Sequence, residues 1–276
     1  MTVSSPAEGL SPKPLLTISI VTYQPDIPVL RKTFETLERA LRHFDSQSVR
    51  IFIIQNSEHD AVRRAAAEAM NGYPYELISG HGNIGFGRAH NLVLQRTGHF
   101  HLVLNPDIEM EHTALSYATE FLLTNPDCGL LTPEAKGLDG ERQYLCKQYP
   151  PLFDLLLRGF APKFIKSLFS ERLARYEMRR ETSESIFWDP PIVSGCFMFF
   201  RGDVFRNVNG FDPDYFLYFE DFDLSLRTAQ IARIAYVPHV KISHAGGHAA
   251  RKGLWHIKLF VKSAKIFYKK HGLRII

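Results

Sequence analysis

Five carboxylates lie close together in one aromatic segment, at Asp212, Asp214, Glu220, Asp221 and Asp223. The aromatic residues of the same segment include Phe211, Tyr215, Phe216, Tyr218 and Phe219. A carboxylate in a dry pocket has a raised pKa and can act as a general base, so Asp221 and Glu220 are candidate catalytic residues. The start of a helix would explain the same acids, because carboxylates stabilise a helix N-terminus.

A second candidate site is Asn105-Pro106-Asp107, which closes the apolar run 101–104. A divalent cation that bridges phosphates needs one or two carboxylates and takes its other ligands from water and phosphate. Asp107 could supply that carboxylate. It could equally cap the helix that follows a strand-ending turn.

A glycine-rich segment runs from His81 to Asn91, between a predicted strand and a predicted helix. Glycines let a backbone approach a ligand, and a helix N-terminus favours a phosphate. The spacing is G-x-x-G-x-G, which differs from the dinucleotide fingerprint. A plain turn is therefore an alternative, and Arg88 could pair with a phosphate or with Asp107.

Two histidines, His244 and His248, lie in a glycine-containing loop near the C-terminus. A neutral imidazole beside a carboxylate can ligate a metal ion. A single histidine is more often structural, so this candidate depends on its neighbours.

Hydrophobic patterning predicts strands alternating with helices, and hence a wound, largely parallel sheet with ligands at the carboxyl ends of its strands. The predicted strands are 16–23, 49–55, 75–78, 101–104, 128–132, 192–200 and a short edge strand 235–238 that contains a proline. The predicted helices are 27–44, capped by Asp26, then 60–70, 87–95, 113–123 and one from about residue 220.

Length and composition fit one large α/β domain with an appendage. The three cysteines lack a C-x-x-C spacing and are expected to be reduced thiols of a cytoplasmic protein. Residues 1–14 read as a disordered lead-in without the features of a signal peptide. No apolar run reaches the ~18 residues that a membrane span needs.

Five segments in this order resemble glycosyltransferase family two, the inverting nucleotide-sugar enzymes of the GT-A fold. The segments are 19–23, 83–91, 105–107, 193–198 and 210–224, and the resemblance extends over 17–248. It implies a Rossmann-like, wound mixed sheet flanked by helices. The expected domains are a GT-A glycosyltransferase domain at 15–250, with a variable acceptor-side insert at 138–188, and a C-terminal basic amphipathic helix at 251–276.

The resemblance also implies roles for single residues. Asp221 would be the base, beside Glu220, and Asp107 and His244 would hold Mg²⁺ or Mn²⁺. The D-x-D motif of the family has Asn105 at its first position here. Asn56 stands where the family usually has an Asp, so it brings no charge. The expected substrate-binding residues are Thr22, Tyr23, Asn56, Asn83, Arg88, Asn91, Asn105 and Trp188.

Within the family, the segments 83–91 and 219–223 look most like the bacterial rhamnosyltransferase branch. The expected function is transfer of L-rhamnose from dTDP-L-rhamnose to a saccharide or lipid-linked acceptor in bacterial surface polysaccharide synthesis. A galactofuranosyl- or other hexosyltransferase using a UDP-sugar is an alternative, and a non-catalytic nucleotide-sugar-binding protein is a second. A nucleic-acid binder would leave the carboxylates unexplained, because they repel phosphate.

The C-terminal segment 251–276 contains eight Lys or Arg residues and no acid, in a chain of formal net charge +4. At helical spacing, Lys258, Lys262, Lys265 and Lys269 form one stripe, and the apolar residues lie on another side. Such a helix can lie on an anionic bilayer or dock on the domain. We expect peripheral contact with the inner face of the cell membrane, because acceptors of the family are often lipid-linked.

Overall fold

The computed structural model describes residues 13–70, 72–246 and 253–276. Its main sheet is mixed, because β11 runs antiparallel to both of its neighbours while the first four strands are parallel. In sheet order the strands are β3 (Tyr75–Ile78), β2 (Val49–Gln55), β1 (Leu16–Thr22), β4 (Phe100–Leu104), β11 (Phe197–Arg201), β6 (Cys128–Lys136), β12 (Arg233–His244) and β5 (Ile108–Met110). Short strands add β7 (Arg142–Gln143) to β6, β9 (Phe187–Trp188) to β12, and a separate pair, β8 (Cys146–Lys147) with β10 (Ile192–Val193).

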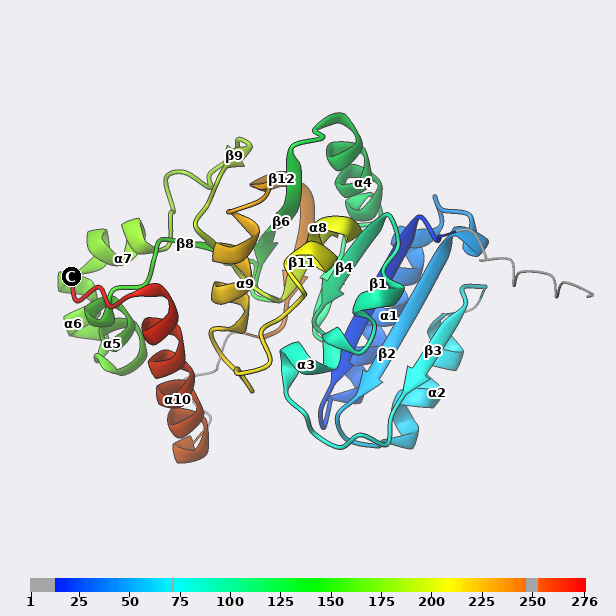
Figure 1. The fold of residues 1–276 in the computed structure, drawn as a ribbon, viewed down its shortest axis with the longest axis horizontal. Coiled ribbons are helices and arrows are strands. Elements are labelled where there is room, and N and C mark those ends of the chain that lie inside the picture. Colours follow the sequence, from blue (N-terminus) through cyan, green and yellow to red (C-terminus); the bar gives the residue numbers. More distant parts are fainter. Residues whose placement is uncertain (1–12, 71, 247–252) are drawn as a thin grey trace, which may run out of the picture.

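Helices cover both faces of the sheet because alternate strand residues point to opposite sides. In β1, Leu16, Ile18 and Ile20 join the core beneath α1 (Ile27–Leu41), α2 (Asp60–Ala69) and α4 (Ala114–Thr124). The other face carries α3 (Phe86–Asn91), α8 (Gly202–Asn207) and α9 (Glu220–Thr228). The remaining helices gather at one end of the molecule (Figure 1): α5 (Leu152–Phe160), α6 (Lys163–Leu168), α7 (Ser170–Tyr176) and α10 (Gly253–His271).

Most predicted elements are confirmed within a few residues, and Asp26 caps α1 by accepting a hydrogen bond from the Val29 amide at 3.2 Å. The predicted edge strand 235–238 is wrong. β12 is twelve residues long and lies inside the sheet, between β6 and β5. The register between β12 and β6 shifts between Val237 and Lys241, and Pro238 lies in this bulge. Its missing N–H therefore interrupts no ladder.

Two buried histidines lie beneath the sheet face that carries α3 and α8. His90 Nδ1 is 2.7 Å from the Ser19 hydroxyl, and His101 contacts the hydroxyls of Thr17 and Ser19 at 2.9 and 3.1 Å. Both imidazoles are fully buried. Burial lowers the pKa of His90 well below its ordinary value and that of His101 to about 3. Both rings are therefore neutral in the folded protein near pH 7.

The histidine pair should make the fold sensitive to mild acid. Between about pH 6.5 and pH 3 the unfolded chain binds a proton at His101 and the folded chain does not, so the free energy of unfolding falls as the pH falls. His101 should remove about 2 kcal/mol between pH 7 and pH 5, and His90 acts in the same direction. Urea unfolding at both pH values measures the loss.

The matched controls remove one histidine each. In His101→Gln, the loss of stability between pH 7 and pH 5 should shrink by about 2 kcal/mol, whereas it should be unchanged in His43→Gln, because His43 is exposed. An equal loss in both variants would contradict the assignment of a neutral, buried His101.

Candidate active site

The carboxyl ends of three parallel strands meet at one edge of the sheet, as expected for a ligand site in a wound fold. Thr22 ends β1, and its carbonyl accepts a hydrogen bond from the Asn56 amide at 2.8 Å. Asn105 follows β4, next to β1. The Thr22 hydroxyl is buried without a partner among the described residues, and Tyr23 is half exposed. The Thr22 hydroxyl, which lacks a hydrogen-bond partner among the described residues, and the exposed Tyr23 ring therefore lie where the nucleotide is predicted to bind.

Asp107 and His244 come together as the sequence predicts, because β5 pairs with β12 and places Ile108 opposite His244. The His244 Nε2 atom is 3.5 Å from Asp107 Oδ1, which is buried and has no hydrogen-bond partner in the part of the chain that the structure describes. Gln143 Oε1 lies 2.9 Å from His244 Nδ1. If Nδ1 donates to this amide oxygen, Nε2 keeps a free lone pair toward Asp107.

Gln143 was not predicted, since nothing in its sequence surroundings resembles a motif. It reaches His244 from β7, within the insert, and its Nε2 also donates to the carbonyls of His244 and Gly246. A hydrogen bond to the second ring nitrogen of a metal-ligating histidine is the usual way to fix the orientation of the ring. Gln143 therefore has the position of a residue that orients His244.

The Asp107–His244 pair fits a hard divalent cation that takes its other ligands from phosphate and water. Gly246 lies directly against both side chains, because a Cβ there would be 2.5 Å from Asp107 Oδ2 and 2.7 Å from His244 Nε2. In the described parts of the chain, no cluster of three or more His, Cys, Asp or Glu side chains could hold a metal ion. A cation here would thus have two ligands among the described side chains. His248 lies outside the described residues.

Asp221 is the second residue of α9, which begins directly after two residues in the left-handed region, Tyr218 (φ 72°) and Phe219 (φ 67°). Non-glycine residues in this region store strain, which is common at functional sites. Asp221 Oδ2 accepts from the Gly195 amide at 2.9 Å, and Oδ1 accepts from the Phe222 amide at 3.0 Å. Burial raises the pKa of this carboxyl despite those hydrogen bonds. Both interpretations of the acidic segment therefore hold: Asp221 lies at the start of a helix, and its carboxyl has a raised pKa.

Glu220 differs from its neighbour in exposure. It is buried, and its Oε2 has no hydrogen-bond partner among the residues described. Burial and the adjacent Asp221 charge raise the pKa of the Glu220 carboxyl. Asp221 keeps partial access to solvent. Of the two predicted catalytic carboxyls, Asp221 is the one that a substrate hydroxyl can approach.

The two residues before β11, Gly195 and Cys196, contact both parts of the candidate site. The Cys196 carbonyl accepts from the Asn105 amide at 2.9 Å, while the preceding amide, that of Gly195, donates to Asp221. Burial raises the pKa of the Cys196 thiol to about 12, and the charges of Asp107 and Asp221 both add to this rise. Asp221 and the loop that leads to Asp107 are therefore bonded to the main chain of two successive residues, Gly195 and Cys196.

The glycine-rich segment packs on the acidic aromatic segment more closely than a plain turn requires. Gly85 has φ 92°, and a Cβ there would lie 2.4 Å from the Phe216 carbonyl oxygen. A Cβ at Gly87 would lie 2.6 Å from the Phe211 Cβ. Asn56 donates to the Gly85 carbonyl at 3.0 Å. These glycines thus permit contact between two parts of the protein itself, beside any role in ligand binding.

Three residues predicted to hold the nucleotide and diphosphate have hydrogen-bond partners within the protein. Asn91 uses both ends of its amide on the Phe211 backbone, at 2.6 and 2.9 Å. Arg88 donates to the Pro213 carbonyl at 2.6 Å and makes no contact with Asp107. Asn83 accepts from the Gly85 amide at 3.1 Å. Arg88 and Asn91 thus join the glycine-rich segment to the segment before Asp221, and the predicted contact of all three residues with substrate stays a prediction.

Trp188 is not brought to this edge of the sheet. It lies in β9, opposite Ala235 near the beginning of β12, whereas His244 ends β12. Its ring packs against Phe121, and the Arg233 guanidinium lies 4.3 Å from its centroid. These contacts give Trp188 a packing role, and its prediction as a substrate-binding residue gains no support from its position.

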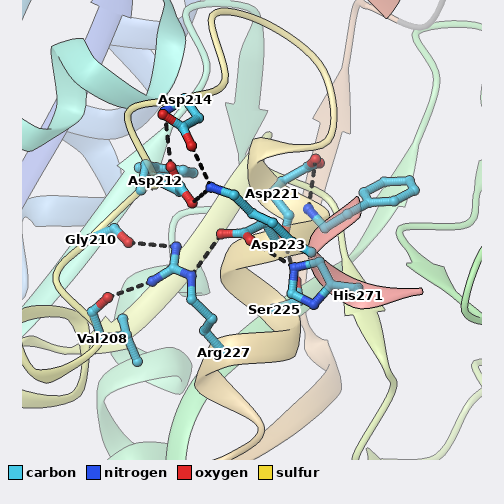
Figure 2. A network of polar contacts seen from close by, with 12 residues as sticks. Val208, Gly210, Asp212, Asp214, Asp221, Asp223, Ser225, Arg227 and His271 are labelled. Atoms are coloured by element: carbon cyan, nitrogen blue, oxygen red, sulfur yellow. Dashed lines mark hydrogen bonds and ion pairs between the residues drawn. The ribbon is translucent and has the colours of Figure 1, made fainter. Parts of the chain in front are cut away.

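The C-terminal helix α10 packs on α9 (Figure 1). Of the two arrangements that the sequence allowed, docking on the domain is therefore the one that the structure has. Phe267 is fully buried against Phe219 and Phe222, whereas the lysine stripe of α10 is exposed. Figure 2 shows the polar contacts that hold the helix end: His271 Nε2 is 2.8 Å from Asp223 Oδ1, and Asp223 Oδ2 accepts from Arg227. α10 therefore braces the helix that carries Asp221.

Membrane-spanning helices are not found in residues 13–70, 72–246 and 253–276, where every helix is too short or too polar to cross a bilayer.

No protein-family profile matches the chain. Among curated proteins it is 27% identical over 249 residues to rhamnosyltransferase WbbL of Escherichia coli (strain K12), covering 83% of this chain and 85% of that protein. It is 25% identical over 268 residues to N-acetylglucosaminyl-diphospho-decaprenol L-rhamnosyltransferase of Mycobacterium tuberculosis, covering 92% and 83% of the two chains.

Solved structures give the same fold. A mannosyltransferase from Pyrobaculum calidifontis in complex with GDP-Man and Mn²⁺ aligns with a TM-score of 0.59 and 16% identity, over 96% of this chain and 79% of that one. GalNAc-T7 with UDP, GalNAc and Mn²⁺ aligns with a TM-score of 0.61 and 13% identity, over 84% and 43%. With the two carboxylate sites at one sheet edge, these likenesses identify the chain as a glycosyltransferase of the GT-A fold, similar to bacterial rhamnosyltransferases.

Proposed function

We propose that this glycosyltransferase transfers L-rhamnose from dTDP-L-rhamnose to a saccharide or lipid-linked acceptor in the synthesis of bacterial surface polysaccharide. Two curated rhamnosyltransferases align over more than four fifths of their length, which supports the donor. One of them is named for a lipid-linked diphosphate acceptor, which supports a reaction at the cytoplasmic face of the membrane. A UDP-hexose donor is the alternative, and a direct comparison of donor binding distinguishes the two.

The observation that carries this proposal has two parts: Asp107 lies beside His244, and the loop leading to Asp107 and the Asp221 carboxylate are bonded to the successive residues Cys196 and Gly195. An acceptor hydroxyl has a high pKa and is a poor nucleophile. Asp221 accepts its proton while the oxygen attacks the anomeric carbon from the side opposite the diphosphate, so the configuration inverts. The raised pKa of Asp221 suits this role, because it makes the carboxylate a stronger base.

Asp107 and His244 hold the divalent cation, Mg²⁺ or Mn²⁺, in this proposal. When bound, such an ion neutralises charge that develops on the leaving diphosphate. Gln143 keeps the His244 ring in the orientation for ligation. Thr22 and Tyr23 lie at the strand end where the nucleotide binds, and the unpartnered Thr22 hydroxyl is a ready contact for it.

The donor is tested by thermal shift with a panel of nucleotide sugars and Mn²⁺. A ligand that binds only the folded protein raises Tm, because it stabilises the folded state. At a free ligand concentration of one hundred times Kd, the free energy of unfolding rises by about 2.7 kcal/mol. We expect dTDP-L-rhamnose to raise Tm most. A larger rise with UDP-galactofuranose or another UDP-hexose would replace the rhamnosyl assignment by the alternative.

The cation site is tested by calorimetry of donor binding with and without Mn²⁺. Asp107→Ala should abolish the difference that Mn²⁺ makes. Gln143→Ala should weaken Mn²⁺ affinity by about 10–100-fold, the usual effect of removing a partner of a ligating histidine. The control is Gln47→Ala, at an exposed glutamine before β2. If Mn²⁺ makes no difference to the wild-type protein, the ligand assignment fails.

A further inference from the structure

The insert contains a cavity that the proposed reaction does not use. It measures about 390 Å³ and lies between α5, α6 and α7. Three cations line it, those of Arg158, Lys166 and Arg179, with the hydroxyls of Ser167 and Ser170. One carboxylate, Glu177, is the only acid in this lining. Cations and hydroxyls around a partly open cavity are groups that can recognise a phosphate.

The carboxylate does not balance these cations. Glu177 Oε2 is 2.6 Å from the Arg179 guanidinium, and its Oε1 is 3.6 Å from Arg158 and 3.9 Å from the ammonium of Lys147. Burial, together with the charge of Arg158, lowers the pKa of Lys147 to about 7. An anion in the cavity would relieve this crowding of positive charge.

Apolar side chains are exposed beside the same cavity. Phe164 and Leu168 of α6 are 68% and 78% exposed, and Leu156 of α5 is 50% exposed. Lys166 and Ser167, which line the cavity, lie between Phe164 and Leu168 in the chain. A short helix with large apolar residues on the surface and cations beside them is suited to the boundary between headgroups and hydrocarbon.

We infer that this cavity binds the phosphate group of a lipid, whose chain passes over Phe164 and Leu168. The two sources of this chemistry are a phospholipid headgroup and the prenyl diphosphate of a lipid-linked acceptor, and the second rests on the proposed function. The cavity lies on the side of the molecule that carries the proposed base, because Tyr176, which ends α7 beside Glu177, shares a buried cluster with Phe219, two residues before Asp221.

The headgroup source is tested by vesicle flotation of the full chain. Phosphatidylglycerol vesicles should bind the wild type, and Arg158→Gln/Lys166→Gln should bind about 30-fold more weakly, since each charge near a membrane contributes about 1 kcal/mol. Phe164→Ser/Leu168→Ser should also weaken binding. Arg64→Gln and Leu123→Ser are the controls, at exposed residues of α2 and α4, and should bind like the wild type.

The acceptor source is tested by thermal shift with geranyl diphosphate, inorganic diphosphate and geraniol. Geranyl diphosphate should raise Tm most, and the same two double variants should reduce the rise. Binding to phosphatidylglycerol vesicles alone assigns the site to headgroups, and binding to geranyl diphosphate alone assigns it to the acceptor.

Three results overturn the inference: binding to neither probe, equal binding to phosphatidylcholine and phosphatidylglycerol vesicles, or unchanged binding by the Arg158→Gln/Lys166→Gln variant. The thermal shift caused by dTDP-L-rhamnose is measured on the same proteins. If that shift is absent in the wild type while lipid binding persists, the proposed donor fails and the lipid site stands. If the shift is present without lipid binding, only the lipid site fails.

Discussion

Replacing Asp221 by Asn should lower kcat by about 10²–10⁴-fold, the usual contribution of a general base. Asparagine keeps the size of the side chain and can still accept the Gly195 amide hydrogen bond, but it cannot take a proton from the acceptor. In the wild type, the acid limb of the pH profile of kcat/KM should lie above the range of an ordinary aspartate, because burial raises the pKa of Asp221. Initial rates with saturating donor measure both effects.

The control for this variant is Asp214→Asn in the same acidic segment. Asp214 is exposed and pairs with Lys270, so kcat should change by no more than a few-fold. Donor binding, followed by thermal shift, should persist in Asp221→Asn. Near-normal turnover in that variant would remove Asp221 from the role of base, whatever happens to donor binding.

Replacing Phe267 by Ala should lower the free energy of unfolding by about 3–5 kcal/mol. The Phe267 side chain is fully buried between the rings of Phe219, Phe222 and Tyr149, so its removal leaves a cavity between α10 and α9. Urea unfolding at pH 7 measures the change. Because α9 carries Asp221, kcat should fall as well.

A matched substitution on the exposed side of the same helix separates packing from helix propensity. Val261 is 44% exposed, and Val261→Ala should change stability by no more than about 0.5 kcal/mol. A small effect of Phe267→Ala, close to that of Val261→Ala, would mean that α10 is not docked in solution.

The sequence predicted the strands and helices of the first half closely, because apolar residues predominate in the buried strands β1, β2 and β4 and α1 begins at a capping aspartate. The second half was harder. β12 was predicted as a short edge strand because a proline normally ends a strand, and the bulge that accommodates Pro238 leaves no sequence signal. Phe267 was not recognised as the anchor of α10, because a pattern of lysines does not say what a helix packs against.

Residues of the candidate site were easier to predict where their side chains have few alternative partners, as with a carboxylate and an imidazole that can share a metal ion. The pairing of Asp107 with His244 followed from the resemblance and agrees with the distance between them. Asn91 and Arg88 were harder to assign, because an amide or a guanidinium can bind a phosphate or a backbone carbonyl equally well. Here the carbonyls of Phe211 and Pro213 take them. Gln143 carried no signal, since its role exists only through contact with a strand about one hundred residues away.

The junction at residues 194–196 has a consequence for how such an enzyme can diverge. The Gly195 amide donates to Asp221, the proposed base, and the Cys196 carbonyl accepts from Asn105 in the loop that leads to Asp107. Main-chain hydrogen bonds therefore set the separation between the proposed base and the proposed cation site, and substitutions of side chains elsewhere in the pocket should leave that separation unchanged. Side chains that line the pocket can then change to accept other sugars or other acceptors, while the distance between the proposed base and the proposed cation site stays the same.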